Sequence, residues 1–312
     1  MPSATCTHGR FAHDALLYRT PEEFQRGVGG FVDEGLADGE PVMVAVPGPR
    51  ITALRLALGR AADAVRFVDM EELGRNPGRI IPFVREWVDG HGGRRVRFVG
   101  EPIWSGRGPR EMVEATRHEG LINLAFADAN ATILCPYDAA RLESWVLADV
   151  ERTHPTMLSL SGDRSPSAHY TDPCVMYRTT GSALPVPAEP VSEVAITYDL
   201  AGLRQFVEAH AVAGGLERER VDDLLLAANE AATNALIHAG RPGAVRIWKQ
   251  DGHLICEITD GGRITDPLAG RRRPDSVRPG GRGLWLINQL CDLVELRPGP
   301  PGNTLRLHMS LT

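Results

Sequence analysis

Apolar positions in the first half of the chain follow two alternating spacings. Short apolar runs predict strands at 11–18, 40–46, 65–70, 95–100 and 131–135. Between them, apolar residues recur at helical spacing and predict helices at 21–36, 51–58, 80–88, 109–126 and 139–149. Strands that alternate with helices are typical of a parallel sheet covered on both faces. We therefore expect a three-layer, mostly parallel α/β domain over residues 10–178.

The pattern changes after residue 178. Residues 179–192 are rich in proline and small residues, which is typical of an extended linker. We expect a second domain over 193–312, in which Asp251-Gly252 is a strong hairpin-turn signal. Its predicted elements are a strand at 193–198, helices at 200–213 and 216–239, hairpin strands at 244–250 and 253–259, a helix at 284–290 and a last strand at 305–309.

Composition narrows the class of protein. The chain has 312 residues, 43% of them hydrophobic, which suits two domains with full cores. A formal net charge of -6 argues against a general nucleic-acid binder. The 5 cysteines have no Cys-x-x-Cys spacing, which indicates reduced thiols rather than disulfides or zinc ligands. Without a membrane-length apolar run or a signal-peptide core, we expect a cytoplasmic protein with no membrane contact.

The helix predicted at 216–239 carries an unusual polar stripe. Glu230, Asn234 and His238 are four residues apart and so lie in one line among buried alanines. Carboxylate and amide oxygens are the ligands that Mg²⁺ prefers, and a carboxylate can also orient or deprotonate a nucleophile. A histidine at a helix end is more often a partner of the helix dipole than a ligand. Taken alone, the stripe is more typical of a solvated helix face than of a ligand site.

Three glycine-containing motifs follow the stripe. An aspartate with two glycines at a strand end can accept a hydrogen bond from an exocyclic amine while a planar ring approaches the backbone. A glycine loop that opens onto a helix offers free N–H groups to phosphate, and nearby arginines add donors. Each motif alone is also typical of an ordinary turn or surface loop. The motifs are Asp260-Gly261-Gly262, Gly281-Arg282-Gly283 behind an arginine-rich loop that starts at Arg271, and Gly302-Asn303-Thr304.

In this order, the stripe and the three motifs resemble the GHKL ATPase superfamily, and within it the anti-sigma-factor serine kinases. The resemblance covers about the last 120 residues and implies a two-layer α/β sandwich with a mixed sheet. At the phosphate end, it implies that Asn234 ligates Mg²⁺ and that Glu230 acts as the catalytic base or orients the attacking hydroxyl. Gly281 and Gly283 would cradle the phosphates of ATP.

At the adenine end, the resemblance implies that Asp260 holds the adenine amine and that Gly262 lets the ring lie close. Thr304 would lie under the adenine. The cofactors implied are ATP and Mg²⁺. The implied partners are an alternative sigma factor and an anti-anti-sigma STAS protein, which the domain would phosphorylate on Ser or Thr in a partner-switching cycle. A homodimer formed through the ATPase half is also implied.

Other functions stay open at this stage. The domain could be a non-catalytic, nucleotide-dependent module that binds the sigma factor. A sensor histidine kinase is disfavoured because a proline-rich linker, not a helical dimerisation hairpin, precedes residue 193. A metabolic enzyme is disfavoured because the first half shows no catalytic triad, metal-ligand set or dinucleotide motif.

The first half resembles the MEDS sensory domain, a degenerate relative of recombinase-type ATPases. The resemblance rests on residues from His13 and Tyr18 to the run at 134–138, with Gly39-Glu40, Glu101-Pro102, and Glu119 with Asn123 between them. The turn after the second strand lacks Gly-Lys-Ser/Thr, so we expect no nucleotide hydrolysis there.

A ligand pocket could lie at the strand ends of this half. His13 and Tyr18 are its predicted lining residues, and Glu101 and Trp104 could line it as well. The alternative is that His13 and Tyr18 are satisfied core or edge polar residues. Cys135 lies in an apolar strand and is expected to pack rather than to react.

Overall fold

The computed structural model describes residues 11–181, 184–187, 191–238, 243–274, 281–300 and 302–311. Contacts divide the chain into two units, Met1–Thr180 and Gly181–Thr312. The predicted linker at 179–192 and the arginine-rich loop after Arg271 therefore lie partly outside the described residues. Among the described helices, none has the length and apolar character needed to cross a bilayer.

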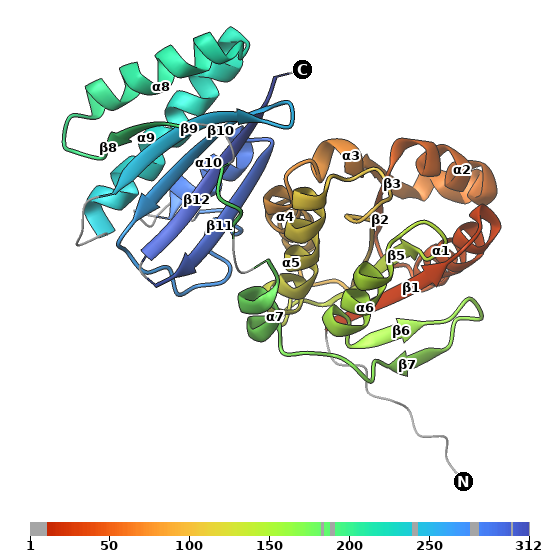
Figure 1. Ribbon diagram of the computed structural model, residues 1–312. Coiled ribbons are helices and arrows are strands. Elements are labelled where there is room, and N and C mark those ends of the chain that lie inside the picture. Colours follow the sequence, from red (N-terminus) through yellow and green to blue (C-terminus); the bar gives the residue numbers. More distant parts are fainter. Residues whose placement is uncertain are drawn as a thin grey trace. The chain divides into compact units, whose positions relative to one another are not determined.

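The first unit is built on a seven-stranded sheet in the order β3-β2-β4-β5-β1-β6-β7 (Figure 1). Neighbouring strands are parallel except for β6 and β7, which confirms the mostly parallel sheet predicted from the sequence. The strands are β1 (Phe11–Tyr18), β2 (Val42–Val46), β3 (Val65–Asp69), β4 (Val96–Gly100), β5 (Ala131–Asp138), β6 (Thr156–Leu158) and β7 (Arg164–Pro166).

Helices cover both faces of this sheet. By their contacts, α1 and α2 form one group, and α4, α5, α6 and α7 form another, which gives the predicted three layers (Figure 1). The helical elements are α1 (Pro21–Ala37), α2 (Gly48–Leu58), η1 (Gly59–Ala64), α3 (Met70–Leu73), η2 (Pro77–Arg79), α4 (Ile80–Asp89), α5 (Pro109–Ala125), α6 (Ser144–Thr153) and α7 (Pro173–Thr179).

Side chains along β1 point alternately to the two helix layers that cover the sheet. Successive side chains of a strand point to opposite faces of the sheet. Leu16 and Tyr18 pack into the apolar cluster that α1 and α2 share with the sheet. His13 contacts Asn123 of α5, so it faces the other layer. Residues only a few positions apart on β1 therefore belong to separate parts of the core.

The helix predicted at 139–149 begins later, at Ser144. Strand β5 continues to Asp138, whose carboxylate accepts the N–H of Ala140 and whose carbonyl accepts the N–H groups of Arg141 and Leu142. These bonds form a turn that competes with the first helical turn. The β6–β7 hairpin and α7 that follow were not predicted, because their short segments carry little periodicity.

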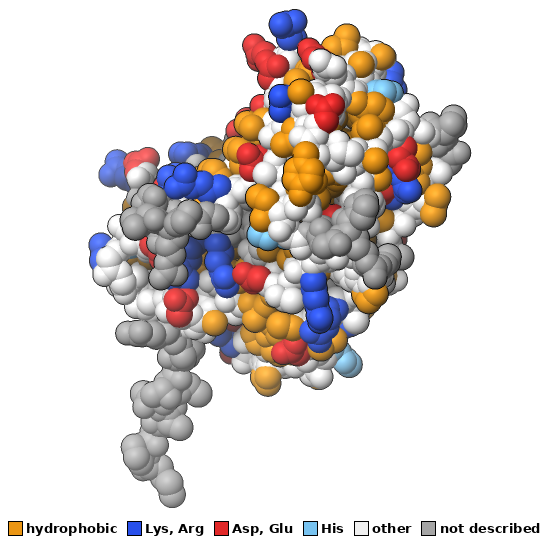
Figure 2. Space-filling view, turned by 90° about the vertical axis from the view of Figure 1, so that its left-hand side faces the viewer, with side chains coloured by type: hydrophobic (Ala, Val, Ile, Leu, Met, Phe, Trp, Pro, Cys, Tyr) orange, Lys and Arg blue, Asp and Glu red, His pale blue; other side chains and the backbone are white. Residues whose placement is uncertain are grey.

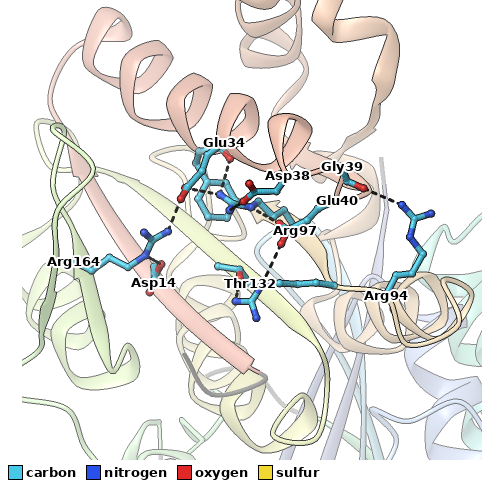
Figure 3. A network of polar contacts seen from close by, with 11 residues as sticks. Asp14, Glu34, Asp38, Gly39, Glu40, Arg94, Arg97, Thr132 and Arg164 are labelled. Atoms are coloured by element: carbon cyan, nitrogen blue, oxygen red, sulfur yellow. Dashed lines mark hydrogen bonds and ion pairs between the residues drawn. The ribbon is translucent and has the colours of Figure 1, made fainter. Parts of the chain in front are cut away.

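Arg97 of β4 is the centre of a buried ion-pair network in the first unit (Figure 3). Its guanidinium lies 2.6 Å from a Glu34 oxygen, 2.5 Å from a Glu40 oxygen and 3.4 Å from an Asp38 oxygen. Glu34 also lies near Arg164 of β7, which pairs with the buried Asp14 of β1. The network therefore links α1 to both the centre and the edge of the sheet.

Arg97→Ala should lower the free energy of unfolding by about 3 kcal/mol, since it removes a buried guanidinium that pairs with the largely buried Glu40 and leaves that carboxylate only Arg95, at 3.3 Å. The control Arg85→Ala removes exposed pairs and should cost about 1 kcal/mol or less. The Arg97 hydrogen bond holds the pKa of Glu34 below its ordinary value of 4.5, so this part of the stabilisation exists above pH 4.5 and is lost as the pH falls further. Urea unfolding of both variants at several pH values measures these effects; equal losses for both would contradict the network's role.

The second unit is a five-stranded sheet in the order β11-β12-β10-β9-β8. Every hydrogen-bonded pair of neighbouring strands described here is antiparallel, so the sheet is not mixed as we predicted. The helical crossover makes β10 and β11 run in the same direction, but β12 lies between them and pairs antiparallel with both. The strands are β8 (Ser192–Ala195), β9 (Ala244–Gln250), β10 (His253–Asp260), β11 (Leu293–Gly299) and β12 (Gly302–Ser310).

Helices α8 (Leu200–Gly214), α9 (Arg218–His238) and α10 (Arg282–Leu290) form the second layer and share one apolar core with the sheet (Figure 1). The predicted hairpin between β9 and β10 has Asp251 and Gly252 at positive φ, 50° and 74°. Positive φ at both central residues is the type I′ geometry, which the Asp-Gly pair favours. The two-layer α/β sandwich expected from the sequence is thus observed.

Candidate functional site

Helix α9 positions the polar stripe at the edge of the second unit's core. Its alanines and leucines pack inward, and Ala231 and Ala235 are buried beside the stripe. Glu230 and Asn234 are half-buried, whereas His238 at the helix end is exposed. The stripe is therefore neither fully solvated nor part of the core. A half-buried position of this kind suits a group that binds a ligand.

The glycine loop before α10 lies directly against this stripe. A Cβ atom at Gly283 would lie 2.8 Å from Asn234 Nδ2 and 3.0 Å from Glu230 Oε2, so only glycine fits without moving both side chains. Gly281 is the N-cap of α10 with φ 75°, and no described side chain caps the helix. The N-terminus of α10 thus presents backbone N–H groups near a carboxylate and an amide, which suits a metal-bound phosphate.

The other predicted residues meet where β10 ends beside β12. Asp260 pairs with Asn303 in the sheet register, and Thr304 is opposite Thr259. Asp260 Oδ1 accepts hydrogen bonds from the Gly262 N–H at 2.6 Å and from Asn303 Nδ2 at 3.0 Å. Among the described residues both donors reach Oδ1, so Oδ2 is the oxygen that can accept from a ligand.

Helix α9 connects the two groups. A Cβ atom at Gly262 would lie 3.4 Å from the carbonyl oxygen of His238, so the C-terminal end of α9 reaches the Asp260 turn. One turn or two earlier on the same helix, Asn234 and Glu230 face Gly283. Six of the seven predicted nucleotide residues therefore lie on α9, at the turn after β10 or at the start of α10, and Thr304 lies on β12 opposite Thr259. Their individual roles stay predictions.

The first unit does not place His13 and Tyr18 in one pocket. The two side chains project from opposite faces of β1 into different clusters. The Tyr18 hydroxyl donates to Glu101 Oε1 at 3.0 Å. Trp104 contacts Arg107 in a cation–π arrangement 4.1 Å from the ring centroid. The sensory pocket predicted from these residues becomes two separate polar clusters.

Around Tyr18 lies a buried charge cluster at the carboxyl ends of the parallel strands. Arg50 forms an ion pair with Glu101, which is fully buried, and its Nη2 lies 3.4 Å from Asp138 Oδ2. The Arg50 guanidinium also lies over the Tyr18 ring, 5.0 Å from its centroid. Burial raises the pKa of Tyr18, so its hydroxyl remains a donor at neutral pH.

Around His13 lies a second buried cluster, on the α5 side of the sheet. Its Nε2 atom is 3.4 Å from Glu119 Oε2 and 3.5 Å from Cys135 Sγ. His154 Nε2 is also 3.4 Å from Glu119 Oε2, and the two imidazole centroids are 4.1 Å apart. Burial and the nearby His154 lower the pKa of His13, which favours a neutral ring.

Sequence reasoning missed three residues of these clusters. His154 and Arg50 were not predicted as site residues, although Arg50 lies in the turn after the second strand that lacks the P-loop motif. Asn303, which orients Asp260, appeared only as the middle of a Gly-x-Thr motif. The signal available for Asn303 was its place in the register opposite Asp260, and register requires knowing that β12 pairs with β10.

Comparisons with known proteins agree with this arrangement. The family model described as MEDS, the methanogen/methylotroph, DcmR sensory domain, matches residues 12–155. The model described as a histidine kinase-like ATPase domain matches residues 195–309. The protein therefore combines a MEDS domain with a histidine kinase-like ATPase domain, as the sequence resemblance indicated.

A curated relative narrows the second domain further. Over 128 residues the chain is 30% identical to "Serine-protein kinase RsbW" from Bacillus pumilus (strain SAFR-032), and the alignment covers 36% of this chain and 75% of the relative. The chain belongs to the histidine kinase-like ATPase family that includes this kinase. A solved structure of another ATPase domain aligns with 49% of this chain and 70% of its own, with a TM-score of 0.35 and 10% identity, which is too low to define a common fold.

Replacing Arg50 tests whether the Tyr18 cluster depends on charge compensation. Arg50→Ala should lower the free energy of unfolding by about 3–5 kcal/mol, because Glu101 then stays buried without its cation. Adding Glu101→Leu to Arg50→Ala should recover most of that loss, since the buried charge is removed. The matched control Arg60→Ala, at an exposed position of η1, should change stability by about 0.5 kcal/mol or less. Thermal and urea unfolding measure all three, and a double variant no better than Arg50→Ala would refute this account.

Proposed function

We propose that the protein is an anti-sigma regulator that binds Mg-ATP in its C-terminal unit and phosphorylates an anti-anti-sigma STAS partner on Ser or Thr. The observation that carries this proposal is the meeting of Glu230 and Asn234 with the glycine loop at Gly283. A carboxylate, an amide and free helix N–H groups at one point suit phosphoryl transfer better than they suit packing. The 30% identity to a serine-protein kinase supports the same interpretation.

At the phosphate end, Asn234 would supply an oxygen ligand to Mg²⁺, and the N–H groups at the start of α10 would bind the phosphate oxygens. When bound, Mg-ATP supplies the transferable phosphoryl group and neutralises the charge that develops during transfer. Glu230 would accept the proton of the attacking hydroxyl or hold that hydroxyl in line. Gly283 keeps this space open because a side chain there would meet both residues.

At the adenine end, Asp260 would accept a hydrogen bond from the exocyclic amine through Oδ2. Its orientation is fixed because Asn303 and the Gly262 N–H both hold Oδ1. The Thr304 side chain points to the outer face of the sheet, as Arg306 does, because the core residues Leu305 and Leu307 alternate with them, so only the Thr304 backbone borders the adenine end. Asn303 also accepts the N–H of Ile264 at 3.3 Å, so it ties the segment after the turn to the sheet.

Partner binding fits the surface of the second unit. Four large apolar side chains around α8 and α9 are exposed, and Figure 2 shows hydrophobic side chains grouped between charged ones on the face toward the viewer. Such groups are typical of surfaces that contact other proteins. The four are Tyr198, Val212, Leu226 and Ile237. We assign this surface to the sigma factor or the STAS partner, and the MEDS domain to sensing the signal that biases their exchange.

Substituting Glu230 and Asn234 separates binding from transfer. Glu230→Ala should reduce phosphate transfer to a purified STAS partner by about 10²-fold or more while leaving ATP affinity nearly unchanged. Asn234→Ala should abolish the magnesium-dependent part of ATP binding. Glu219→Ala, an exposed acid in the first turn of the same helix, is the control and should change neither. Calorimetry with ATP, and radiolabel transfer with and without Mg²⁺, measure these outcomes.

Full transfer by Glu230→Ala would rule out its role as base. Nucleotide-dependent capture of a sigma factor with no transfer by the wild type would instead favour the non-catalytic binding module. Absence of any heat with adenine nucleotides would overturn the proposal as a whole.

Gly283→Ala tests the close approach of the loop. Its new Cβ would displace Asn234 and Glu230, so ATP affinity should fall by about 10-fold or more. Gly299→Ala, at a position where a Cβ meets no atom within 4 Å, serves as the matched control and should bind ATP as the wild type does. Fluorescent-nucleotide titration compares the two; unchanged affinity in Gly283→Ala would place the phosphates elsewhere.

A further inference from the structure

We propose that the His13 cluster of the MEDS domain is a binding site for a divalent transition metal ion, with His13, Glu119, Cys135 and His154 as its ligands. Each residue offers one ligand atom, and these atoms all lie within 4.8 Å of one another. Two imidazole nitrogens, a carboxylate oxygen and a thiolate are a tetrahedral donor set of the kind that Zn²⁺ prefers. The inference concerns the first unit alone and does not depend on the proposed kinase activity.

The four ligands come from distant parts of the chain. His13 lies on β1, Glu119 on α5, Cys135 on β5, and His154 directly after α6. Each is at most 1% exposed. Because the ligands are spread over three elements and a connection, the Cys-x-x-Cys and His-x-x-x-His spacings of many zinc sites are missing here. The cysteine spacing therefore predicted reduced structural thiols and no zinc ligands. The arrangement of the four side chains instead favours a metal site at Cys135.

In both imidazoles the Nδ1 atom, which points away from the proposed metal, already forms a hydrogen bond, as it does in many metal sites. His154 Nδ1 lies 2.9 Å from the backbone carbonyl of Val150, and a carbonyl can only accept, so Nδ1 carries the proton. Asn123 Nδ2 donates to the Thr153 carbonyl at 2.8 Å, which turns its Oδ1 toward His13 Nδ1 at 3.1 Å. His13 Nδ1 therefore also carries a proton. Holding the outer N–H in this way is how proteins orient histidine ligands.

As a consequence, the inner nitrogens of two neutral rings point lone pairs into the cluster. Both Nε2 atoms lie 3.4 Å from the same Glu119 oxygen, and neither Glu119 oxygen accepts a hydrogen bond from the described residues. The Tyr137 hydroxyl lies 3.4 Å from His154 Nε2 and the Cys135 thiol lies 3.5 Å from His13 Nε2, so neutral donors reach both rings, but the buried Glu119 carboxylate still needs a cation. The cation is either a proton on a ring or a metal ion shared by all four groups.

Charge balance favours the metal ion. One carboxylate and one thiolate cancel a divalent charge, while the two imidazoles stay neutral, so the occupied site has no net charge to bury. On binding, the Cys135 thiol releases its proton to solvent and its sulfur bonds to the metal. Within the described residues no arginine or lysine pairs with Glu119, so a bound divalent ion would supply the missing positive charge.

The full-length protein, purified without chelator and dialysed against Zn²⁺, should hold about one equivalent of metal by mass spectrometry. After exchange to Co²⁺ it should show tetrahedral d–d bands and a thiolate-to-cobalt charge-transfer band. Cys135→Ser should lose the charge-transfer band and weaken binding by about 100-fold. Cys256→Ser, a buried thiol of the second unit, is the control and should keep both signals. A folded wild-type protein that holds no stoichiometric metal under these conditions would overturn the proposal.

Asn123→Ala tests the site through a residue that touches no metal. Losing the amide that orients His13 should weaken Zn²⁺ binding by about 10- to 100-fold while the circular dichroism spectrum stays unchanged. Asn130→Ala, which removes a similar side-chain hydrogen bond to Gly93 at the surface, should bind Zn²⁺ as the wild type does. Equal affinity in both variants would show that His13 is not a ligand and would refute the proposed set.

Discussion

The need to compensate buried carboxylates shapes both units of this protein. An ionised carboxylate taken out of water is costly unless a cation or several donors replace its hydration. Glu101 is compensated by an ion pair with Arg50 and a hydrogen bond from the Tyr18 hydroxyl, and Glu40 by an ion pair with Arg97. On the outer face of the second sheet, Glu257 lies 2.8 Å from Arg306 and Glu295 lies 2.8 Å from His308. In each case the partner comes from another strand or helix, so the pair also fixes how the elements align.

Glu119 is a buried carboxylate that has no arginine or lysine partner among the described residues. Its neighbours are two imidazoles whose outer N–H groups are held by Asn123 and by the Val150 carbonyl. The usual buried pair brings its own cation, whereas here that cation must come from elsewhere. The two polar clusters of the first unit thus differ in the cation that balances the buried carboxylate. In the Tyr18 cluster the cation is an arginine, and in the His13 cluster it is a proton or a metal ion. They lie on opposite faces of β1, so each belongs to a separate layer of the core.

Much of the second unit could be predicted from the sequence because its signals are local. The stripe of α9, the Asp251-Gly252 hairpin and the glycine before α10 each depend on neighbours a few residues away. The antiparallel sheet could not be predicted, because the insertion of β12 between β10 and β11 is a long-range choice. The same limit explains His154, whose role depends on meeting β1 across the sheet. Motifs whose residues are neighbours in the sequence can be predicted from the sequence. Contacts between residues that only the strand order brings together cannot.

The segment that enters the second unit is attached to its sheet. Arg297 of β11 donates to the Gly181 carbonyl, and Arg306 of β12 donates to the Pro185 carbonyl at 2.7 Å. Arg306 lies two residues beyond Thr304 and three beyond Asn303, on the strand that borders the proposed adenine end. The incoming chain is therefore anchored on the same strand that borders the proposed adenine end. In the function proposed above, β12 serves both as this anchor and as one wall of the nucleotide site.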